Sequence, residues 1–409
     1  MTQRTLVPKD IDFTDLNTFV DGRIEEIFHE LRENYPVAWH PTSSKNNQEK
    51  GFWILSRYQD IIDVWKNTVN FSSEYGIMLR MHDNKDPAAG KMMVVTDPPR
   101  HTQLRKLHTL AINTRSISSM QAKIHTYVSK LLDNIEASVE FDFTENIAAK
   151  LPVGVTCELM DIPFCDWELI ANLTKTSAAA EDSEFCRNTS TEETLLSVNK
   201  DIFIYFLDLI HKRQKKIGDD LISHLIKTKI DNEYLTEEEI ILNCFSLLIG
   251  GNETTKYASA GGLYALIKNP SAWNLLKKTP SSIATTVEEI LRWTTPVMHS
   301  MRVATHDIKI QEQAIFKGET VTLWNNSANR DKNIFIDPFT FNINRISNRH
   351  LTFGWGPHHC LGAAIARLEI KILFQEIIKR KYKITLTSAP ERVRSNVMAG
   401  YKHLPIKIH

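Results

Sequence analysis

Hydrophobic positions recur with the helical period of about 3.6 residues along most of the chain after residue 120, whereas strand-like runs are few and short. Residues 51–55 (GFWIL) predict a strand, and residues 58–67 (YQDIIDVWKN) predict an amphipathic helix directly after it. Short strand-like pieces recur at 303–310 and 319–328, before a final long helix. The pattern predicts a mainly α fold with a minor β portion. Because no repeat, linker or low-complexity tract interrupts residues 1–409, we expect a single domain.

One predicted helix is much longer than the others. Thr236 and Glu239 form a capping box at its start, apolar periodicity continues to Lys268, and Asn269-Pro270 ends it. A helix of about 32 residues is roughly 48 Å long, since each residue adds about 1.5 Å. Such a helix is expected to cross the whole molecule.

The centre of this helix, LLIGGNETTKYA at 247–258, contains residues that a helix interior disfavours. Gly250 and Gly251 each cost about 1 kcal/mol relative to Ala, and the hydroxyls of Thr254 and Thr255 compete for backbone carbonyls. Glu253 adds a carboxyl group to an otherwise apolar run. Two interpretations are open: a groove that admits a ligand and faces an acid–alcohol pair, or a close helix–helix crossing in which Glu253 is salt-bridged.

Residues 72–96 show no steady period and predict a long loop. Met78, Met81, Met92 and Met93 lie in it, more methionines than an exposed polar loop needs. The loop is therefore expected to fold over something apolar, or to pack on the core.

Composition and charge exclude several classes of protein. Lys and Arg total 49 and Asp and Glu total 49, so the net charge is zero, which argues against a general nucleic-acid binder. The most apolar stretch, 240–251, is too short to cross a bilayer, and the N-terminus lacks the apolar run of a secretory signal. The five cysteines are odd in number and have no CxxC spacing. We therefore expect a cytoplasmic protein with free thiols and no membrane anchor.

A cysteine lies in a glycine-containing loop within residues 350–369 (HLTFGWGPHHCLGAAIARLE). Gly354, Gly356 and Pro357 predict a tight loop before a helix that starts near Leu361. Cys360 is thus expected at a helix N-terminus, where the macrodipole lowers the pKa of a thiol.

Three interpretations of Cys360 are open. A thiolate on a rigid turn suits a soft metal or haem iron, but a lone cysteine is also often a small buried hydrophobe. A zinc site could combine it with His350, His358 and His359, although adjacent His359 and Cys360 rarely both reach one ion. A dinucleotide-binding loop is excluded, because His359 stands where the third glycine of that motif would be.

The segment FGWGPHHCLG at 353–362 matches, at every fixed position, the haem-binding loop of the cytochrome P450 family, F-G-x-G-x-H-x-C-x-G. The chain resembles soluble bacterial class I members of this family, and its motifs follow the family's order from residue 97 to residue 369. The other similar segments are DPPRHTQLR at 97–105, GGNETT at 250–255, the E-x-x-R pair Glu289 and Arg292, and ANRDKNIFIDPFTFNINR at 328–345.

The resemblance implies the P450 fold, a triangular helical prism with small β-sheets. It implies haem b (iron protoporphyrin IX) between the long distal helix and the helix after the cysteine loop. Cys360 would be the metal ligand, an axial thiolate, with Phe353 packed beside the proximal face. The residues that would contact the haem propionates are His101, Arg105, Arg302 and His358.

The resemblance also implies roles for two charged groups of residues. Glu289 and Arg292, one helical turn apart, would join Arg345 and lock the core around the cysteine loop. Thr254 and Glu253 would be the catalytic pair, in which the hydroxyl positions water and the carboxylate relays protons. The commoner family residue at position 253 is Asp.

Electrons would come from a separate ferredoxin- or flavodoxin-like partner, since the chain carries no second domain for a reductase. Arg100, Lys106 and Arg115 lie on the segment that forms the proximal surface in the family, and we expect them to help dock an acidic partner.

The activity implied is that of a monooxygenase that uses O₂ to hydroxylate or otherwise oxidise a lipophilic small molecule, with natural-product biosynthesis favoured. Oxidation of sterol or fatty-acid-type lipids is the alternative, as are coupling, cyclisation and desaturation. Outside enzymes, a haem-binding sensor or carrier is also considered. His299 and Ser300 are polar candidates for orienting a substrate. The expected apolar substrate contacts are Met92, Met93, Ile249, Gly250, Val297, Met298 and Met398.

Overall fold

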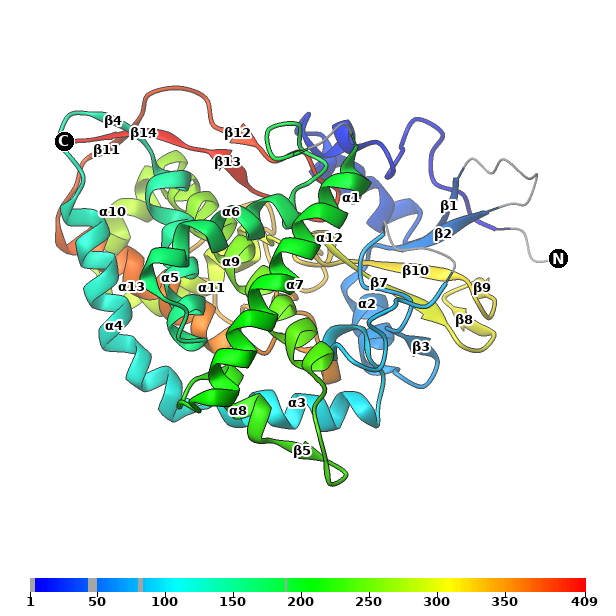
Figure 1. The fold of residues 1–409 in the computed structure, drawn as a ribbon. Helices are drawn as coiled ribbons and strands as arrows, with labels where there is room; N and C mark the ends of the chain where they lie inside the picture. Colours follow the sequence, from blue (N-terminus) through cyan, green and yellow to red (C-terminus); the bar gives the residue numbers. More distant parts are fainter. Residues whose placement is uncertain (1–3, 43–49, 80–83, 188–189) are drawn as a thin grey trace.

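The computed structural model describes residues 4–42, 50–79, 84–187 and 190–409. Helices make up most of the molecule, and the largest sheet lies to one side of them (Figure 1). The predicted mainly α fold with a minor β portion is therefore confirmed. The α-helices are α1 (Ile24–Asn34), α2 (Tyr58–Lys66), α3 (Arg100–Ala111), α4 (Thr114–Asp133), α5 (Lys150–Leu159), α6 (Trp167–Ala178), α7 (Thr191–Lys215), α8 (Leu221–Lys227), α9 (Glu237–Lys268), α10 (Pro270–Lys278), α11 (Ile283–Thr294), α12 (Asn325–Ala328) and α13 (Ala363–Lys379).

The strands form small sheets. In the largest sheet the order is β1-β2-β10-β7-β3, with β2 and β10 parallel and the other neighbours antiparallel. A second sheet has the order β11-β14-β4, and the pairs β5-β6, β8-β9 and β12-β13 are hairpin-like ribbons. The strands are β1 (Val37–Thr42), β2 (Lys50–Leu55), β3 (Phe71–Ser72), β4 (Glu140–Asp142), β5 (Lys229–Ile230), β6 (Glu233–Tyr234), β7 (His299–Ala304), β8 (Ile308–Ile310), β9 (Gln313–Ile315), β10 (Thr320–Trp324), β11 (Ile384–Leu386), β12 (Glu391–Arg392), β13 (Tyr401–His403) and β14 (Pro405–Ile408).

Helix α9 crosses the middle of the helical region and has the predicted bounds (Figure 1). The Thr236 hydroxyl accepts a hydrogen bond from the Glu239 backbone N–H (3.2 Å), and the Glu239 carboxylate accepts one from the Thr236 N–H (2.9 Å). The helix packs against α5, α6, α7 and α11. Its position is thus fixed from several sides, which makes its central residues a rigid wall.

Two large apolar clusters enclose α9. One joins α4, α11 and α13 to its second half, through residues such as Leu263, Ile290 and Leu373. The other joins α5, α7 and α8 to its first half, through residues such as Phe206 and Leu248. These clusters hold α9 and α13 in fixed positions relative to each other.

The strand and helix predicted near the N-terminus are present, and the helix after the cysteine loop begins later than predicted. The predicted strand and helix are β2 and α2. Within the predicted loop, residues 73–79 and 84–96 are irregular apart from a short 3₁₀ turn at Met93–Val95, while Ser72 ends β3 and Met81 lies outside the described residues. The final long helix begins at Ala363 rather than near Leu361, because a 3₁₀ turn at Gly356–His358 and a further turn precede it.

Candidate functional site

The cysteine loop is tightly packed against α2. Gly354 and Gly356 have φ angles of +65° and +67°, which L side chains rarely adopt. A Cβ atom at Gly356 would lie 2.9 Å from the backbone oxygen of Trp65, and one at Gly354 would lie 3.1 Å from the Trp65 ring. The Cys360 N–H donates to the Phe353 carbonyl (2.8 Å), which closes the loop. Both glycines are therefore required for the loop to reach α2.

The Cys360 thiol is bordered by arginines and by backbone N–H groups. The residue is accessible, although protein atoms surround its thiol. Desolvation by burial raises the pKa of this thiol above its usual value, even though the backbone N–H groups of Gly362 and Ala363, and Arg105, favour the thiolate. The expectation that the helix N-terminus lowers this pKa is therefore wrong, because desolvation outweighs the amides. The thiolate needs a further positive charge beside it, which an iron ion would supply.

Four basic side chains from three segments gather near Cys360: His101 and Arg105 on α3, Arg302 on β7, and His358 in the loop. The imidazole rings of His101 and His358 have centroids 4.0 Å apart. Burial, followed by nearby arginines, lowers the pKa of His101 to about 4 and that of His358 to about 2. Both rings are thus neutral at pH 7.

None of these four side chains is paired with a carboxylate among the described residues, although the His358 ring lies 3.2 Å from the Ser73 hydroxyl. Both ring nitrogens of His101 are buried without a hydrogen bond. Within the described residues, neither Arg105 nor Arg302 forms an ion pair, and Arg302 donates only to the Met301 carbonyl (2.6 Å). Two carboxylates bound here would satisfy the guanidinium and imidazole groups. The residues therefore fit the propionates of a haem whose iron lies at Cys360.

The zinc interpretation of the loop is not supported. Among the residues that the structure describes, no three His, Cys, Asp or Glu side chains converge on a point suited to a metal ion. The His350 ring lies 3.1 Å from a Glu288 oxygen. Arg367 also donates to Glu288 (2.7 and 3.0 Å), and its guanidinium lies over the Phe353 ring. Burial alone would raise the pKa of Glu288, but its bonds to His350 and Arg367 lower it to about 2.

The two central glycines of α9 have different surroundings, so both interpretations of this region hold in part. A Cβ atom at Gly250 would meet nothing within 4 Å, whereas one at Gly251 would lie 2.8 Å from the Thr156 methyl on α5. Gly250 therefore faces open space, and Gly251 permits a close helix crossing. The Thr254 hydroxyl, one turn on, donates to the Gly250 carbonyl (2.7 Å). This bond satisfies the hydroxyl within the helix.

Glu253 is buried and pairs with Lys256, a residue that no motif in the sequence singled out. Its carboxylate bonds to the ammonium group of Lys256, one turn later on α9. Glu253 is 3% exposed and Lys256 1% exposed. The Lys256 ammonium also lies 4.5 Å from the centre of the Tyr257 ring. The acid is thus salt-bridged and makes no hydrogen bond to Thr254 among the described contacts.

The structure brings Glu289, Arg292 and Arg345 together. Arg292 donates to both Glu289 oxygens (2.8 and 2.7 Å), and Arg345 donates to one of them (3.1 Å). Arg292 also donates to the carbonyls of Asn329 and Pro338 (2.9 and 2.8 Å). Glu289 and Arg292 are fully buried. The group links α11 to the segment that leads into the cysteine loop.

The residues predicted to contact substrate lie in more than one apolar cluster. Ile249, Val297 and Met398 pack in one small apolar cluster, together with Met78 and Tyr257. This cluster borders the same stretch of α9 as Gly250.

The other predicted contacts lie elsewhere. Met93 is buried in the cluster around the first half of α9, next to Met92, and Met298 packs beneath the N-terminal segment. His299 does not orient a substrate, because its Nε2 accepts from the Leu79 N–H (3.0 Å) and its Nδ1 bonds to the Asn396 carbonyl (3.1 Å).

Comparisons with known proteins agree with this geometry. A family model described as Cytochrome P450 matches residues 169–278 and 283–407. The cytochrome P450 NovI of Streptomyces niveus is 33% identical over 411 residues, which cover 100% of this chain and 99% of that protein. Steroid C26-monooxygenase of Mycolicibacterium smegmatis is 30% identical, with 97% and 93% covered. The crystal structure of P450 OxyD, which is involved in the biosynthesis of vancomycin-type antibiotics, has a TM-score of 0.87 and 31% identity, with 97% and 99% covered.

The fold and the cysteine site define a haem–thiolate oxidoreductase that incorporates oxygen. The chain belongs to the cytochrome P450 family. No helix among its described residues is both long enough and apolar enough to span a membrane.

Proposed function

We propose that this P450 binds haem b with Cys360 as the axial ligand and oxidises a lipophilic small molecule of natural-product type. The observation that carries the cofactor assignment is the convergence of Cys360 with four basic groups that lack carboxylate partners among the described residues, two of them, His101 and Arg302, fully buried. When bound, the haem supplies the activation of O₂. The protein's own residues supply positioning and proton transfer, and the electrons come from a separate partner.

On the proximal side, the chain holds the cofactor. His101, Arg105, Arg302 and His358 bind the two propionates, the histidines as neutral donors and the arginines as cations. Phe353, fixed by the Arg367 guanidinium over its ring (4.5 Å), covers the proximal face beside Cys360. The hydrogen bonds that join Glu289 to Arg292 and Arg345 fix the segment that leads into the cysteine loop.

On the distal side, Gly250 leaves room for the substrate beside Thr254. The Thr254 hydroxyl donates to the Gly250 carbonyl, so its oxygen can accept a hydrogen bond from a water molecule and orient it. Glu253 can deliver a proton only if its carboxylate breaks its bond with the Lys256 ammonium group and forms a hydrogen bond with that water molecule. Lys256 is thus a positioning residue that sets how readily the carboxylate is released.

A spectroscopic experiment tests the haem assignment. The reduced protein treated with carbon monoxide is expected to show the red-shifted Soret band of a thiolate-ligated haem, and Cys360→Ala is expected to lose it. Cys165→Ala, which removes an exposed thiol elsewhere, is the matched control and should keep the band. An unchanged band in Cys360→Ala would overturn the assignment.

The substrate class is supported by the relatives and by the apolar cluster of Ile249, Val297 and Met398. NovI aligns with the whole chain, and OxyD belongs to antibiotic biosynthesis. Steroid C26-monooxygenase is nearly as similar, so sterol-type lipids are the second candidate. Titrating the protein with polyketides, peptides and sterols, and recording substrate-induced Soret shifts, separates the two candidates. Shifts with sterols alone would favour the second candidate.

A separate redox partner donates electrons at the proximal surface, where Lys106 on α3 is exposed. Arg100 is a poorer docking residue than expected, because it pairs with Glu239 at the start of α9. The side chain of Arg115 lies outside the described residues. Lys106→Glu should slow reduction by an acidic ferredoxin or flavodoxin and weaken its salt dependence, whereas Lys130→Glu on α4 should not. Equal rates for both variants would argue against docking at Lys106.

A further inference from the structure

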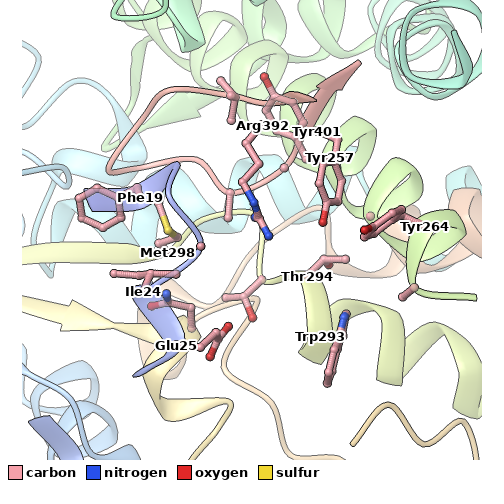
Figure 2. A pocket seen from close by; sticks show the side chains of 18 of the residues that line it. Phe19, Ile24, Glu25, Tyr257, Tyr264, Trp293, Thr294, Met298, Arg392 and Tyr401 are labelled. Atoms are coloured by element: carbon pink, nitrogen blue, oxygen red, sulfur yellow. The ribbon is translucent and has the colours of Figure 1, made fainter. Parts of the chain in front are cut away.

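The structure contains a cavity that neither Cys360 nor Thr254 lines. It has a volume of about 380 Å³ and lies between the N-terminal segment, the second half of α9, the end of α11 and the C-terminal hairpin (Figure 2). None of the residues that surround Cys360 lines it. Tyr257 and Met398 belong both to its wall and to the apolar cluster on the distal side. The cavity is thus a separate space that shares one wall with the substrate region.

Positive charge exceeds negative charge around this cavity. Arg330, Arg392 and Lys268 line it, and Glu25 is the one carboxylate among its described lining residues. Within the part of the chain that the structure describes, Arg392 and Lys268 form no ion pair. Lys268 and Arg392 are exposed and Arg330 is buried, so the cavity carries surplus positive charge with which a bound anion could pair.

Arg330 is the buried member of this group. It is 4% exposed, and its guanidinium donates to the carbonyls of Arg292 (3.0 Å) and Trp293 (2.8 Å). Its nearest carboxylate, Glu25, is 3.7 Å away and is half exposed to solvent. Burial lowers the pKa of Arg330 to about 10, which indicates that this charge is incompletely compensated.

The walls of the cavity are aromatic. Trp293, Tyr264, Tyr401 and Phe339 line it, and the guanidinium groups of Arg330 and Arg392 already lie over aromatic rings. Figure 2 shows the Arg392 side chain reaching into the space between Met298 and Tyr257, with Tyr264 and Trp293 further across the cavity. Aromatic walls with a cationic end suit a flat apolar molecule with one acidic group.

We propose that this cavity binds a small organic carboxylate with an aromatic body, whose carboxylate pairs with Arg392 near buried Arg330 and whose ring lies against Trp293 and Tyr264. This site is additional to the one at which substrate is oxidised. The inference does not depend on haem binding or on the identity of the substrate.

Calorimetric titration of the purified holoprotein with 2-naphthoate tests the proposal, with uncharged 2-naphthamide as the matched probe. We expect 2-naphthoate to bind with a stoichiometry of about one and at least about tenfold more tightly than the amide, since a charge-assisted hydrogen bond is lost in the amide. Both titrations are repeated with 4-phenylimidazole saturating the haem iron. Binding that persists under these conditions supports a separate site, and displacement of naphthoate by the azole overturns it.

Three variants test the charge argument. Arg392→Gln is expected to weaken naphthoate binding at least about tenfold, and Glu25→Gln to strengthen it severalfold, because it removes the competing carboxylate. Lys130→Gln, which removes one exposed positive charge on α4, is the control and should have no effect. Arg392 is exposed, so its substitution leaves the core intact. Equal affinity of wild type and Arg392→Gln, or weaker binding by Glu25→Gln, would overturn the proposal. Because heat is the signal, a failure of the haem assignment would be seen separately in the Soret band.

Discussion

Replacing Lys256 by Met is expected to destabilise the protein strongly. The Lys256 ammonium and the Glu253 carboxylate are both buried and bond directly, so the substitution leaves a charged carboxylate in the interior without a partner. Met preserves most of the volume and the apolar stem of Lys, so little of the effect comes from packing. Removing one member of a buried ion pair costs about 3–5 kcal/mol.

Urea unfolding followed by far-ultraviolet circular dichroism measures this cost. The double variant Glu253→Gln/Lys256→Met removes both charges and should recover most of the lost stability, since replacing a whole buried pair is often close to neutral. Lys123→Met is the control, because Lys123 pairs with Glu158 on the surface and such pairs contribute little. The reasoning would be refuted if Lys256→Met were as stable as Lys123→Met, or if the double variant were no more stable than the single one.

Two further predictions concern α9 and the C-terminal ribbon. Gly250→Ala should raise the free energy of unfolding by about 1 kcal/mol, because Ala favours the helix and its methyl group meets open space. Gly251→Ala should lower the free energy of unfolding, because its methyl group would lie 2.8 Å from a side chain of α5. Equal effects of the two substitutions in urea unfolding would contradict this difference. Burial alone would lower the pKa of His403, but its bonds with Asp142 (2.5 Å) and Glu184 (3.0 Å) raise it, so the folded state binds this proton more tightly than the unfolded chain does. The stabilisation is therefore fully present below about pH 6.5 and is lost as the pH rises through the raised pKa. The stability difference between wild type and His403→Gln should shrink as the pH is raised above about 6.5, and a difference that does not change with pH would count against this reasoning.

The sequence was sufficient to predict features that depend on local chemistry. The capping box of Thr236 and Glu239 and the terminating Asn269-Pro270 gave the bounds of α9, because helix ends are decided by neighbouring residues. The tight loop before Cys360 followed from its glycines and proline. The family resemblance then supplied His101, Arg302 and their neighbours, which no local pattern could have connected.

Features that depend on tertiary packing were beyond the sequence. The raised pKa of Cys360 reflects a balance between desolvation and helix-terminal amides, and burial decides that balance only in the folded chain. The partner of Glu253 could have been suspected from the i, i+3 spacing of Lys256, yet only the structure shows both side chains buried. Met93 and Met298 were grouped with Met398 by their positions in the family, and in the structure the three side chains pack in different apolar clusters.

The contact of Gly354 and Gly356 with Trp65 joins segments from opposite ends of the chain. The cysteine can take up its final orientation only after α2 and the C-terminal quarter have docked. A haem site at Cys360 would therefore require both segments to be packed together, so the haem content of a variant altered at this contact would report on long-range packing.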